Sequence, residues 1–229
     1  FCMASGEPSE IEDDVILAAR DGIGRGISGT AAPVRSADGQ LVGTVLIFKD
    51  VTDSQELKRR LAHSAHHDPL TGMPNRAAFA GALAEAKRQA VEQQRHHVLC
   101  FIDLDRFKPV NDSAGHAAGD ALLQKVAQVI RLQCRADDFA MRLGGDEFVV
   151  LFADCQPEAV RRRAETIIAA IAAISFSWDG RSYSIGASAG LASLATTGDP
   201  LSEADAACYA AKAAGRGRVA IAASLGRAS

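Results

Sequence analysis

Two glycines followed by two acids form the most distinctive local pattern in the chain. Residues 144–148 read Gly-Gly-Asp-Glu-Phe, between two strand-like runs. This arrangement predicts a hairpin, and its glycines would let a substrate approach the backbone because they have no Cβ. Asp146 and Glu147 would then stand at the rim of a sheet, where carboxylates can hold a metal ion and phosphates.

A further acid, Asp103, lies at the end of the apolar strand predicted over residues 98–104. If this strand neighbours the hairpin, Asp103 and Asp146 face one another at one edge of the sheet. Such hard anionic oxygens suit Mg²⁺, and paired metals can clamp both oxygens of a phosphoryl displacement. Taken singly, either acid is better explained as a solvated residue at a strand end.

Residues 105–120 are predicted to form a loop rich in polar groups. Lys108 offers a positive charge to phosphate, while Asn111 and Asp120 offer groups that can bond the edge of a base such as guanine. Asp120 is explained equally well as the N-cap of the next helix. His116 is better interpreted as a residue that fixes the loop than as a catalytic base.

Two cations, Lys212 and Arg216, stand four residues apart at the end of the last predicted helix. On one helix face they could reach a triphosphate. By themselves they are explained as well by complementing the negative end of the helix dipole.

Composition restricts the class of protein. The 229 residues are 48% apolar and carry a net charge of −3. They can form one domain plus a smaller piece, with no overall attraction to nucleic acid or anionic membrane. Five scattered cysteines without a CxxC pair favour reduced thiols in the cytoplasm. The chain contains no run of 18 apolar residues, so neither a membrane span nor a signal peptide is predicted. The start at Phe1 suggests a fragment whose parent could be membrane-anchored.

The first fifty residues are predicted to end in an antiparallel meander. Residues 1–14 are assigned no structure, and three strands follow over residues 15–20, 24–34 and 41–50, with turns at 21–22 and 38–39. A charged helix over 54–65, capped by Thr52 or Asp53, comes next. Its Leu57 and Leu61 indicate a short coiled coil or, equally well, a solvated connector.

The remainder alternates helices and strands, which predicts a mixed central β-sheet flanked by helices, an α/β (α+β) fold. Beyond the strand and hairpin already described, the predicted elements are helices over 77–97, 120–134, 159–174 and 202–214 and a strand over 183–192. The helix over 120–134 has Leu122, Leu123, Val126 and Ile130 at helical spacing.

Seven ordered motifs give the chain a resemblance to the GGDEF diguanylate cyclases. They are Asp68-x-Leu-Thr-Gly-x-x-Asn-Arg76, Phe101-Ile-Asp-Leu-Asp-x-Phe-Lys108, Asn111-Asp112, Gly115-His116, Gly119-Asp120, Arg142-x-Gly-Gly-Asp-Glu-Phe148 and Tyr209-x-Ala-Lys212-x-x-Gly-Arg216. The meander resembles the end of a PAS sensor domain. The expected domains are therefore a PAS-like part over 1–52, a linker helix over 53–66 and a GGDEF domain over 67–224.

The resemblance implies a homodimer in which each domain holds one GTP, and two GTP are joined into cyclic di-GMP with release of two pyrophosphates. Mg²⁺ or Mn²⁺ would be bound by Asp103, Asp146, Glu147 and the Leu104 carbonyl. The catalytic residues would be Asp146, as the general base for the attacking 3′-hydroxyl, Glu147, which would support the metal site, and Lys108, which would hold the phosphates with Lys212 and Arg216. Substrate would be bound by the group Asn111, His116, Asp120, Gly144, Gly145, Lys212 and Arg216.

The resemblance also implies product inhibition, because Arg135-Ala-Asp-Asp138 matches the spacing of the family's RxxD inhibitory site. Arg161–Arg163 could contribute to this inhibitory site but is better explained as a solvated helix face. The chain departs from the family at Gly217, where Asn is usual, at Ser188-Ala-Gly190, where Ser-Ile-Gly is usual, and mildly at Pro109. The change within Ser188-Ala-Gly190 is expected to alter packing, and the change at Gly217 to loosen the terminal turn.

Other functions remain open. A cyclase that selects another base is conceivable, although Asp120 favours guanine. The chain could be a silent GGDEF domain that binds cyclic di-GMP or GTP as a receptor, although silent members typically lose the acids that are intact here. It could also be a module that dimerises or regulates a neighbouring domain such as a phosphodiesterase.

Overall fold

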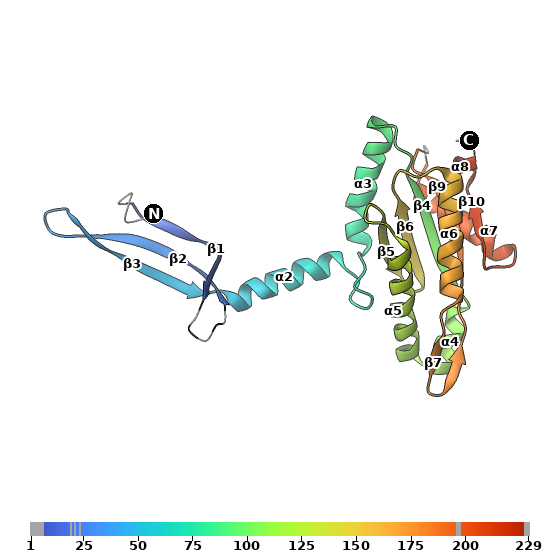
Figure 1. The fold of residues 1–229 in the computed structure, drawn as a ribbon, viewed down its shortest axis with the longest axis horizontal. Helices are drawn as coiled ribbons and strands as arrows, with labels where there is room; N and C mark the ends of the chain where they lie inside the picture. Colours follow the sequence, from blue (N-terminus) through green and yellow to red (C-terminus); the bar gives the residue numbers. More distant parts are fainter. Residues whose placement is uncertain (1–6, 19, 21, 23, 196–197, 227–229) are drawn as a thin grey trace. The chain divides into compact units, whose positions relative to one another are not determined.

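The computed structural model describes residues 7–18, 20, 22, 24–195 and 198–226. The chain divides into two compact units, residues 1–63 and 64–229 (Figure 1). Among the described residues, no helix is both long and apolar enough to cross a membrane.

The first unit is a three-stranded antiparallel sheet. Its strands are β1 (Ser9–Ala18), β2 (Gly24–Arg35) and β3 (Leu41–Asp50), in the order β1-β2-β3. The predicted turn at residues 38–39 is confirmed, because Gly39 has φ +83° and donates its N–H to the Ser36 carbonyl at 2.9 Å. The strand predicted to begin at residue 15 begins earlier, at Ser9, because its pairing with β2 extends to Ala31. Asp21 of the other predicted turn lies outside the described residues.

Helix α2 (Thr52–His66) follows β3 directly. The acid at its start is Asp50, whose Oδ1 accepts the Thr52 N–H at 3.0 Å and the Thr52 hydroxyl at 2.7 Å. The predicted cap at Thr52 or Asp53 is therefore wrong, because Thr52 is already helical. Leu57 is exposed, and the side chain of Leu61 lies outside the described residues.

The second unit is built on a five-stranded sheet in the order β10-β9-β4-β6-β5. Only the β9–β10 pair is parallel, so the predicted mixed sheet is confirmed. The strands of this sheet are β4 (Val98–Asp105), β5 (Phe139–Gly144), β6 (Glu147–Phe152), β9 (Gly186–Ser193) and β10 (Val219–Ile221). A small unpredicted hairpin, β7 (Phe176–Trp178) with β8 (Arg181–Tyr183), takes the start of the strand predicted over 183–192.

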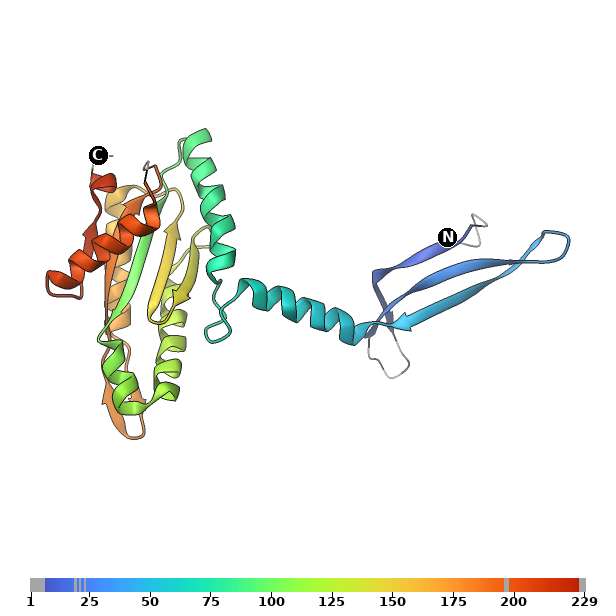
Figure 2. The same ribbon diagram turned by 180° about the vertical axis from the view of Figure 1, so that it is seen from behind.

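Helices cover both faces of this sheet. Their bounds are α3 (Arg76–Glu92), α4 (Phe107–Ala114), α5 (His116–Gln133), α6 (Pro157–Ala172), α7 (Pro200–Ala213) and α8 (Ala223–Gly226). Helices α5 and α6 lie in front of the sheet in Figure 1, and α7 lies in front of it in Figure 2. Strand β4 alternates between two cores: Val98, Cys100, Ile102 and Leu104 pack with α4–α6, whereas Leu99 and Phe101 pack with α3 and α7.

The loop predicted over residues 105–120 is helical, which is a correction. Its apolar residues Phe107, Val110 and Ala118 are buried in the larger core, so the segment folds as α4 and α5 joined at Gly115. Helix α5 begins at His116, so Asp120 lies inside the helix and does not cap it. The predicted inward residues of α5, Leu122, Leu123, Val126 and Ile130, are all buried.

Gly190 lets α7 lie directly on β9. A Cβ at this position would stand 2.0 Å from the Ala204 carbonyl oxygen and 2.3 Å from the Cys208 backbone nitrogen. Both are backbone atoms of α7, which can yield only if the whole helix moves. The close packing of α7 on β9 therefore requires glycine at position 190.

We expect Gly190→Ala to destabilise the second unit by about 1–3 kcal/mol through overpacking. Gly81→Ala in α3 is the matched control, because its Cβ would meet nothing within 4 Å. The control should be neutral or slightly stabilising, since alanine favours a helix. Urea unfolding of both variants measures the difference, and equal stabilities would contradict the close seating of α7.

His97 introduces a pH dependence at the start of β4. Only 3% of this residue is exposed, and neither ring nitrogen has a hydrogen-bond partner among the described residues. Burial lowers the pKa of His97; Asp154 opposes the shift, while Arg95 and His96 add to it. The folded state therefore favours neutral His97, and the unfolded chain binds a proton more readily, near pH 6.5.

We expect this stability contribution to be complete above about pH 6.5 and to be lost as the pH falls below it. Free energies of unfolding measured between pH 7.5 and 5.5 should fall less steeply for His97→Leu than for the unchanged protein. The exposed His66, changed to Gln, is the control and should keep the original slope. An unchanged slope in His97→Leu would contradict this account.

Candidate active site at the β4–β6 edge

The candidate site begins with two acids on neighbouring strands. In the antiparallel pairing of β4 with β6, Asp103 stands opposite Glu147. Directly opposite residues share one face of a sheet. By the alternation of β4, that is the face covered by α7, as it is for Phe101. The prediction that the two strands are neighbours is confirmed.

The turn between β5 and β6 carries Asp146. Gly144 pairs with Glu147, so the chain reverses through Gly145 and Asp146. Gly145 has φ +53°, a conformation that glycine adopts without strain. The Asp146 carbonyl accepts the Leu104 N–H at 3.2 Å, which ties the turn to the end of β4.

Helix α7 adds a cation to these acids. Lys212 Nζ lies 2.5 Å from Asp103 Oδ1. Burial raises the pKa of Asp103; Lys212 opposes this, and Asp146 and Asp105 add to it. Burial also raises the pKa of Glu147, with further contributions from Asp103 and Asp146. The single ammonium of Lys212 cannot neutralise all these carboxylates, so the acids together keep excess negative charge.

Asp105 has a different role from Asp103. It is 7% exposed and accepts hydrogen bonds from the Ser188 hydroxyl at 2.9 and 3.0 Å and from the Gly217 N–H at 3.1 Å. Arg216 Nε lies 3.9 Å from its carboxylate. Asp105 therefore anchors the loop after α7.

Since α7 ends at Ala213 and Arg216 has φ +64°, the prediction that Lys212 and Arg216 share one helix face is wrong.

The predicted base-reading residues lie on α4 and α5. A Cβ on Gly119 would stand 1.8 Å from Asn111 Oδ1, so the absence of a side chain there admits Asn111 against α5. Asp120 is the next residue and is exposed, as are Lys108 and His116. The α4–α5 junction thus presents these polar groups to solvent beyond the end of β4.

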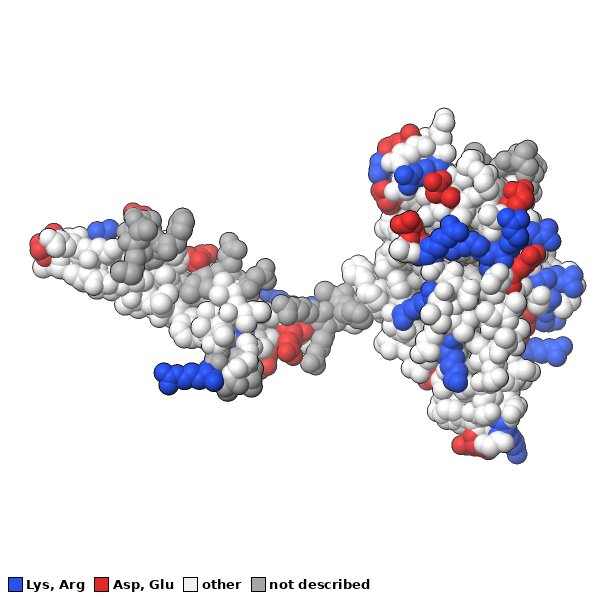
Figure 3. Space-filling view, viewed as in Figure 1, with Lys and Arg blue, Asp and Glu red and all other residues white. Residues whose placement is uncertain are grey.

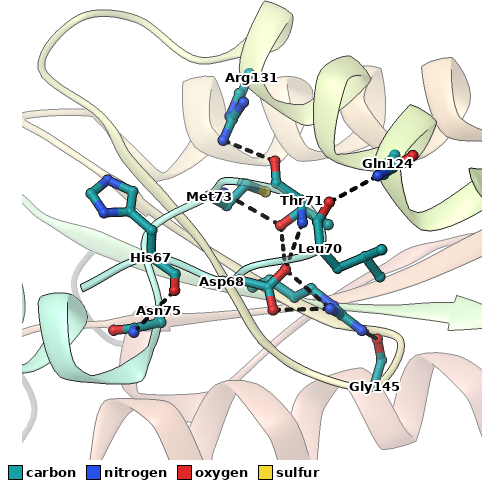
Figure 4. A network of polar contacts seen from close by, with 10 residues as sticks. His67, Asp68, Leu70, Thr71, Met73, Asn75, Gln124, Arg131 and Gly145 are labelled. Carbon is teal, nitrogen blue, oxygen red and sulfur yellow. Dashed lines mark hydrogen bonds and ion pairs between the residues drawn. The ribbon is translucent and has the colours of Figure 1, made fainter. Parts of the chain in front are cut away.

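A network of polar contacts around Arg142 was not assigned a role from the sequence. Arg142 Nη1 donates to both carboxylate oxygens of Asp68 at 3.0 Å, and its Nε and Nη2 donate to the Gly145 carbonyl at 3.1 and 2.7 Å (Figure 4). Burial opposes ionisation of Asp68, but hydrogen bonds from Thr71 and Arg142 outweigh it and lower its pKa. An arginine two residues before a glycine pair was the available signal.

The predicted inhibitory pair divides between surface and interior. Arg135 is exposed, whereas the Asp138 side chain is 1% exposed and forms an ion pair with Arg163 of α6. Asp138 Oδ2 also accepts the Arg135 N–H at 2.7 Å, which closes the turn before β5. Arg163 is therefore not part of a solvated face. Figure 3 shows Lys and Arg side chains gathered on the face of this unit that α6 covers.

The carboxylates where β4 ends and β6 begins suit a hard divalent cation. Among the described residues, no three His, Cys, Asp or Glu side chains are gathered closely enough to enclose a metal by themselves. Magnesium is usually held by one or two carboxylates together with substrate phosphates and water. The excess charge on Asp103 and Glu147, together with this open arrangement, therefore fits Mg²⁺ better than a closed metal centre.

Comparisons with known proteins agree on the family. The family model described as "Diguanylate cyclase, GGDEF domain" matches residues 65–218. The chain is 44% identical over 217 residues to the probable diguanylate cyclase DgcE of Escherichia coli, covering 93% of this chain and 20% of that protein. It is 45% identical over 168 residues to the diguanylate cyclase TpbB of Pseudomonas aeruginosa, covering 71% and 39%. The chain thus spans at most two-fifths of these relatives.

One of the similar proteins is named as a phosphodiesterase and not as a cyclase. The cyclic di-GMP phosphodiesterase PdeB of Shewanella oneidensis is 36% identical over 184 residues, which cover 79% of this chain and 21% of that protein.

Solved structures share the fold of the second unit. The GGDEF domain of TpbB is 44% identical with a TM-score of 0.64, covering 69% of this chain and 94% of that one. The coiled coil and GGDEF domain of DgcB from Caulobacter crescentus, in complex with c-di-GMP, is 31% identical with a TM-score of 0.67, covering 75% and 93%. Because the family model matches more than half of the chain, this chain belongs to the GGDEF family.

Proposed function

We propose that the chain is a diguanylate cyclase that condenses two GTP into cyclic di-GMP and two pyrophosphates. The observation that carries this proposal is the pairing of Asp103 with Glu147, beside Asp146 and under Lys212. Acids that are intact and clustered at a glycine turn are what a metal-assisted phosphoryl transfer requires. The cyclases among the similar proteins support the same reaction.

Asp103, Glu147, Asp146 and the Leu104 carbonyl would hold Mg²⁺ or Mn²⁺, whose chemistry is to neutralise charge on the phosphates and polarise the reacting oxygens. Asp146 stands in the turn and would accept the proton of the attacking 3′-hydroxyl. Lys212 partly neutralises Asp103 and is near enough to turn toward a bound triphosphate. Lys108, in the first turn of α4, and Arg216, in the loop after α7, add positive charge near the end of β4.

Base selection would be made at the α4–α5 junction. The Asn111 amide can donate and accept hydrogen bonds at the edge of guanine, and the Asp120 carboxylate can accept them, with His116 at the same junction. Gly144 and Gly145 would let the nucleotide lie along the backbone, because the space a Cβ would fill at either position is open. Catalysis would then consist of orientation and electrostatic stabilisation rather than covalent chemistry.

One domain would bring one GTP, so the reaction needs two copies that face each other. A homodimer is therefore part of the proposal. The meander of residues 1–52 would be part of a PAS-like sensor that acts through α2. Free cysteines at positions 100, 134, 155 and 208 and the need for GTP favour work in the cytoplasm.

Product would bind at Arg135 and inhibit the enzyme. The exposed guanidinium of Arg135 offers a planar group for guanine or phosphate. Asp138, already paired with Arg163, would chiefly hold the turn that presents Arg135.

A second function is supported by the similarity to PdeB. In this alternative, the domain binds GTP or cyclic di-GMP without turnover and regulates a neighbouring domain. The two functions differ in whether product is formed from GTP.

We expect purified protein with GTP and Mg²⁺ to form cyclic di-GMP, detected by chromatography. Asp146→Ala should lower the rate at least about 10²-fold, because it removes a carboxylate that acts in the transition state. Glu165→Ala, on the exposed surface of α6, is the control and should keep the rate. Binding of GTP without product by the unchanged, dimeric protein would favour the regulatory function.

We expect Arg135→Ala to abolish inhibition by added cyclic di-GMP while leaving the initial rate and the stability unchanged. Asp138→Ala should instead destabilise the domain by roughly 1–3 kcal/mol, because it removes the carboxylate that pairs with the largely buried Arg163. Rates at increasing product concentration and urea unfolding measure the two effects. Inhibition that persists in Arg135→Ala would place the product elsewhere.

A further inference from the structure

Arg142 joins two segments that are far apart in sequence. One side of its guanidinium donates to Asp68, and the other side donates twice to the carbonyl of Gly145. Only 11% of the Arg142 side chain and 17% of the Asp68 side chain are exposed. A planar fork with donors in fixed directions holds both partners at one separation, which a flexible lysine cannot do.

On the Asp68 side, the contacts lead to the end of α2. Asp68 shapes a tight turn by accepting the Thr71 N–H at 2.9 Å and hydroxyl at 2.6 Å, and its own N–H donates to the Met73 carbonyl at 2.7 Å. After this turn, Asn75 donates its backbone N–H to His66 at 2.9 Å and its Nδ2 to Ala65 at 3.0 Å.

The same Asn75 also fixes the next helix. Its Oδ1 accepts the N–H groups of Ala77 and Ala78 at 2.9 and 3.2 Å, so it caps α3. Figure 4 shows Thr71 bound to Asp68, and Asn75 bound to the carbonyl of His67, the residue before Asp68. The last turn of α2 and the first turn of α3 are therefore fastened to the turn that holds Asp68.

On the Gly145 side, the contacts reach the reacting groups. Gly145 immediately precedes Asp146, and Arg142 holds its carbonyl while Leu104 holds that of Asp146. The Arg142 backbone N–H donates to Pro74 at 3.1 Å, which ties the strand itself to the same turn. The Gly145-Asp146 turn is thus held by hydrogen bonds from β4 on one side and, through Arg142, from the α2–α3 connection on the other.

We propose that Arg142 is a positioning residue that couples the last turn of α2 to the Gly145-Asp146 turn. A displacement of Ala65 and His66 would move Asp68, and Arg142 would transmit it to the turn that carries Asp146. The inference rests on the proposed cyclase function. It adds an intradomain route by which α2 sets the rate, beyond bringing two domains together.

The test compares Arg142→Lys, which keeps the charge and loses the fork, with Arg161→Lys, whose ion pair with Glu165 lies exposed on α6. Arg142→Lys should lower kcat about 10- to 10²-fold with little change in KM for GTP, because a misplacement of about 1 Å has such a cost. Amide hydrogen exchange at residues 145–147 should quicken. The control should change neither. Unchanged kcat and exchange in Arg142→Lys would overturn the proposal.

Two further variants test the route. Asp68→Asn combined with Arg142→Lys should add little to either single effect, because both residues act through one contact; fully additive effects would overturn the coupling. Asn75→Ser keeps a cap for α3 but cannot reach Ala65, and it should also quicken exchange at residues 145–147. Unchanged exchange there would overturn the extension to α2.

Hydrogen exchange needs no turnover, so the coupling is tested even if the unchanged protein forms no cyclic di-GMP. In that case the cyclase proposal fails by itself, and the exchange results still decide the role of Arg142.

Discussion

The antiparallel pairing of β4 with β6 is the constraint on which the rest of this domain depends. It sets Asp103 opposite Glu147 and places both at the end of the sheet, one residue from the turn that carries Asp146. Carboxylates gathered in this way repel one another, and burial adds to the cost, so the pKa values of Asp103 and Glu147 are raised. The sheet thus holds a charge distribution that the acids alone would not adopt. Other elements must compensate for it.

Helix α7 supplies part of this compensation, and its position depends on a glycine. Gly190 allows the backbone of α7 to lie against β9, and this seating brings Lys212 to Asp103. The loop that follows is anchored separately by Asp105, which binds Ser188 and Gly217. The two neighbouring acids of β4 therefore differ in function, because one is satisfied by the protein and the other keeps excess charge. That difference separates an anchoring residue, Asp105, from the proposed cation ligand, Asp103.

The sequence indicated those parts of the structure that depend on local pattern. Apolar spacing located α5 and its buried residues, and the glycine pair located the hairpin, because both signals act over a few residues. It missed α4, because polar residues such as Lys108 and Asn111 conceal a short helix held by only a few buried apolar residues. The extra hairpin β7–β8 and the strand β10 are three residues each, too short to leave a periodic signal.

Site residues were predictable by type but not by partner. The acids and cations were found from their spacing and motifs, yet the pairing of Asp138 with Arg163 joins residues 25 apart, and that of Asp68 with Arg142 joins residues 74 apart. No local rule links such positions, because the tertiary fold alone brings them together. For the same reason Asp120 was read both as a cap and as a ligand, and only the start of α5 at His116 excluded the cap.

These long-range pairs differ from surface ion pairs in what they can do. The Arg161–Glu165 pair lies on one exposed helix face and constrains only that helix. Arg142, in contrast, is largely buried and is shared between a carboxylate and a carbonyl on two separate segments. If Asp68 moves, the fork cannot keep both sets of bonds, so a small displacement changes which contacts exist rather than stretching them slightly. Under the proposed coupling, a contact of this kind makes the turn that carries Asp146 sensitive to the position of Ala65 and His66 at the end of α2.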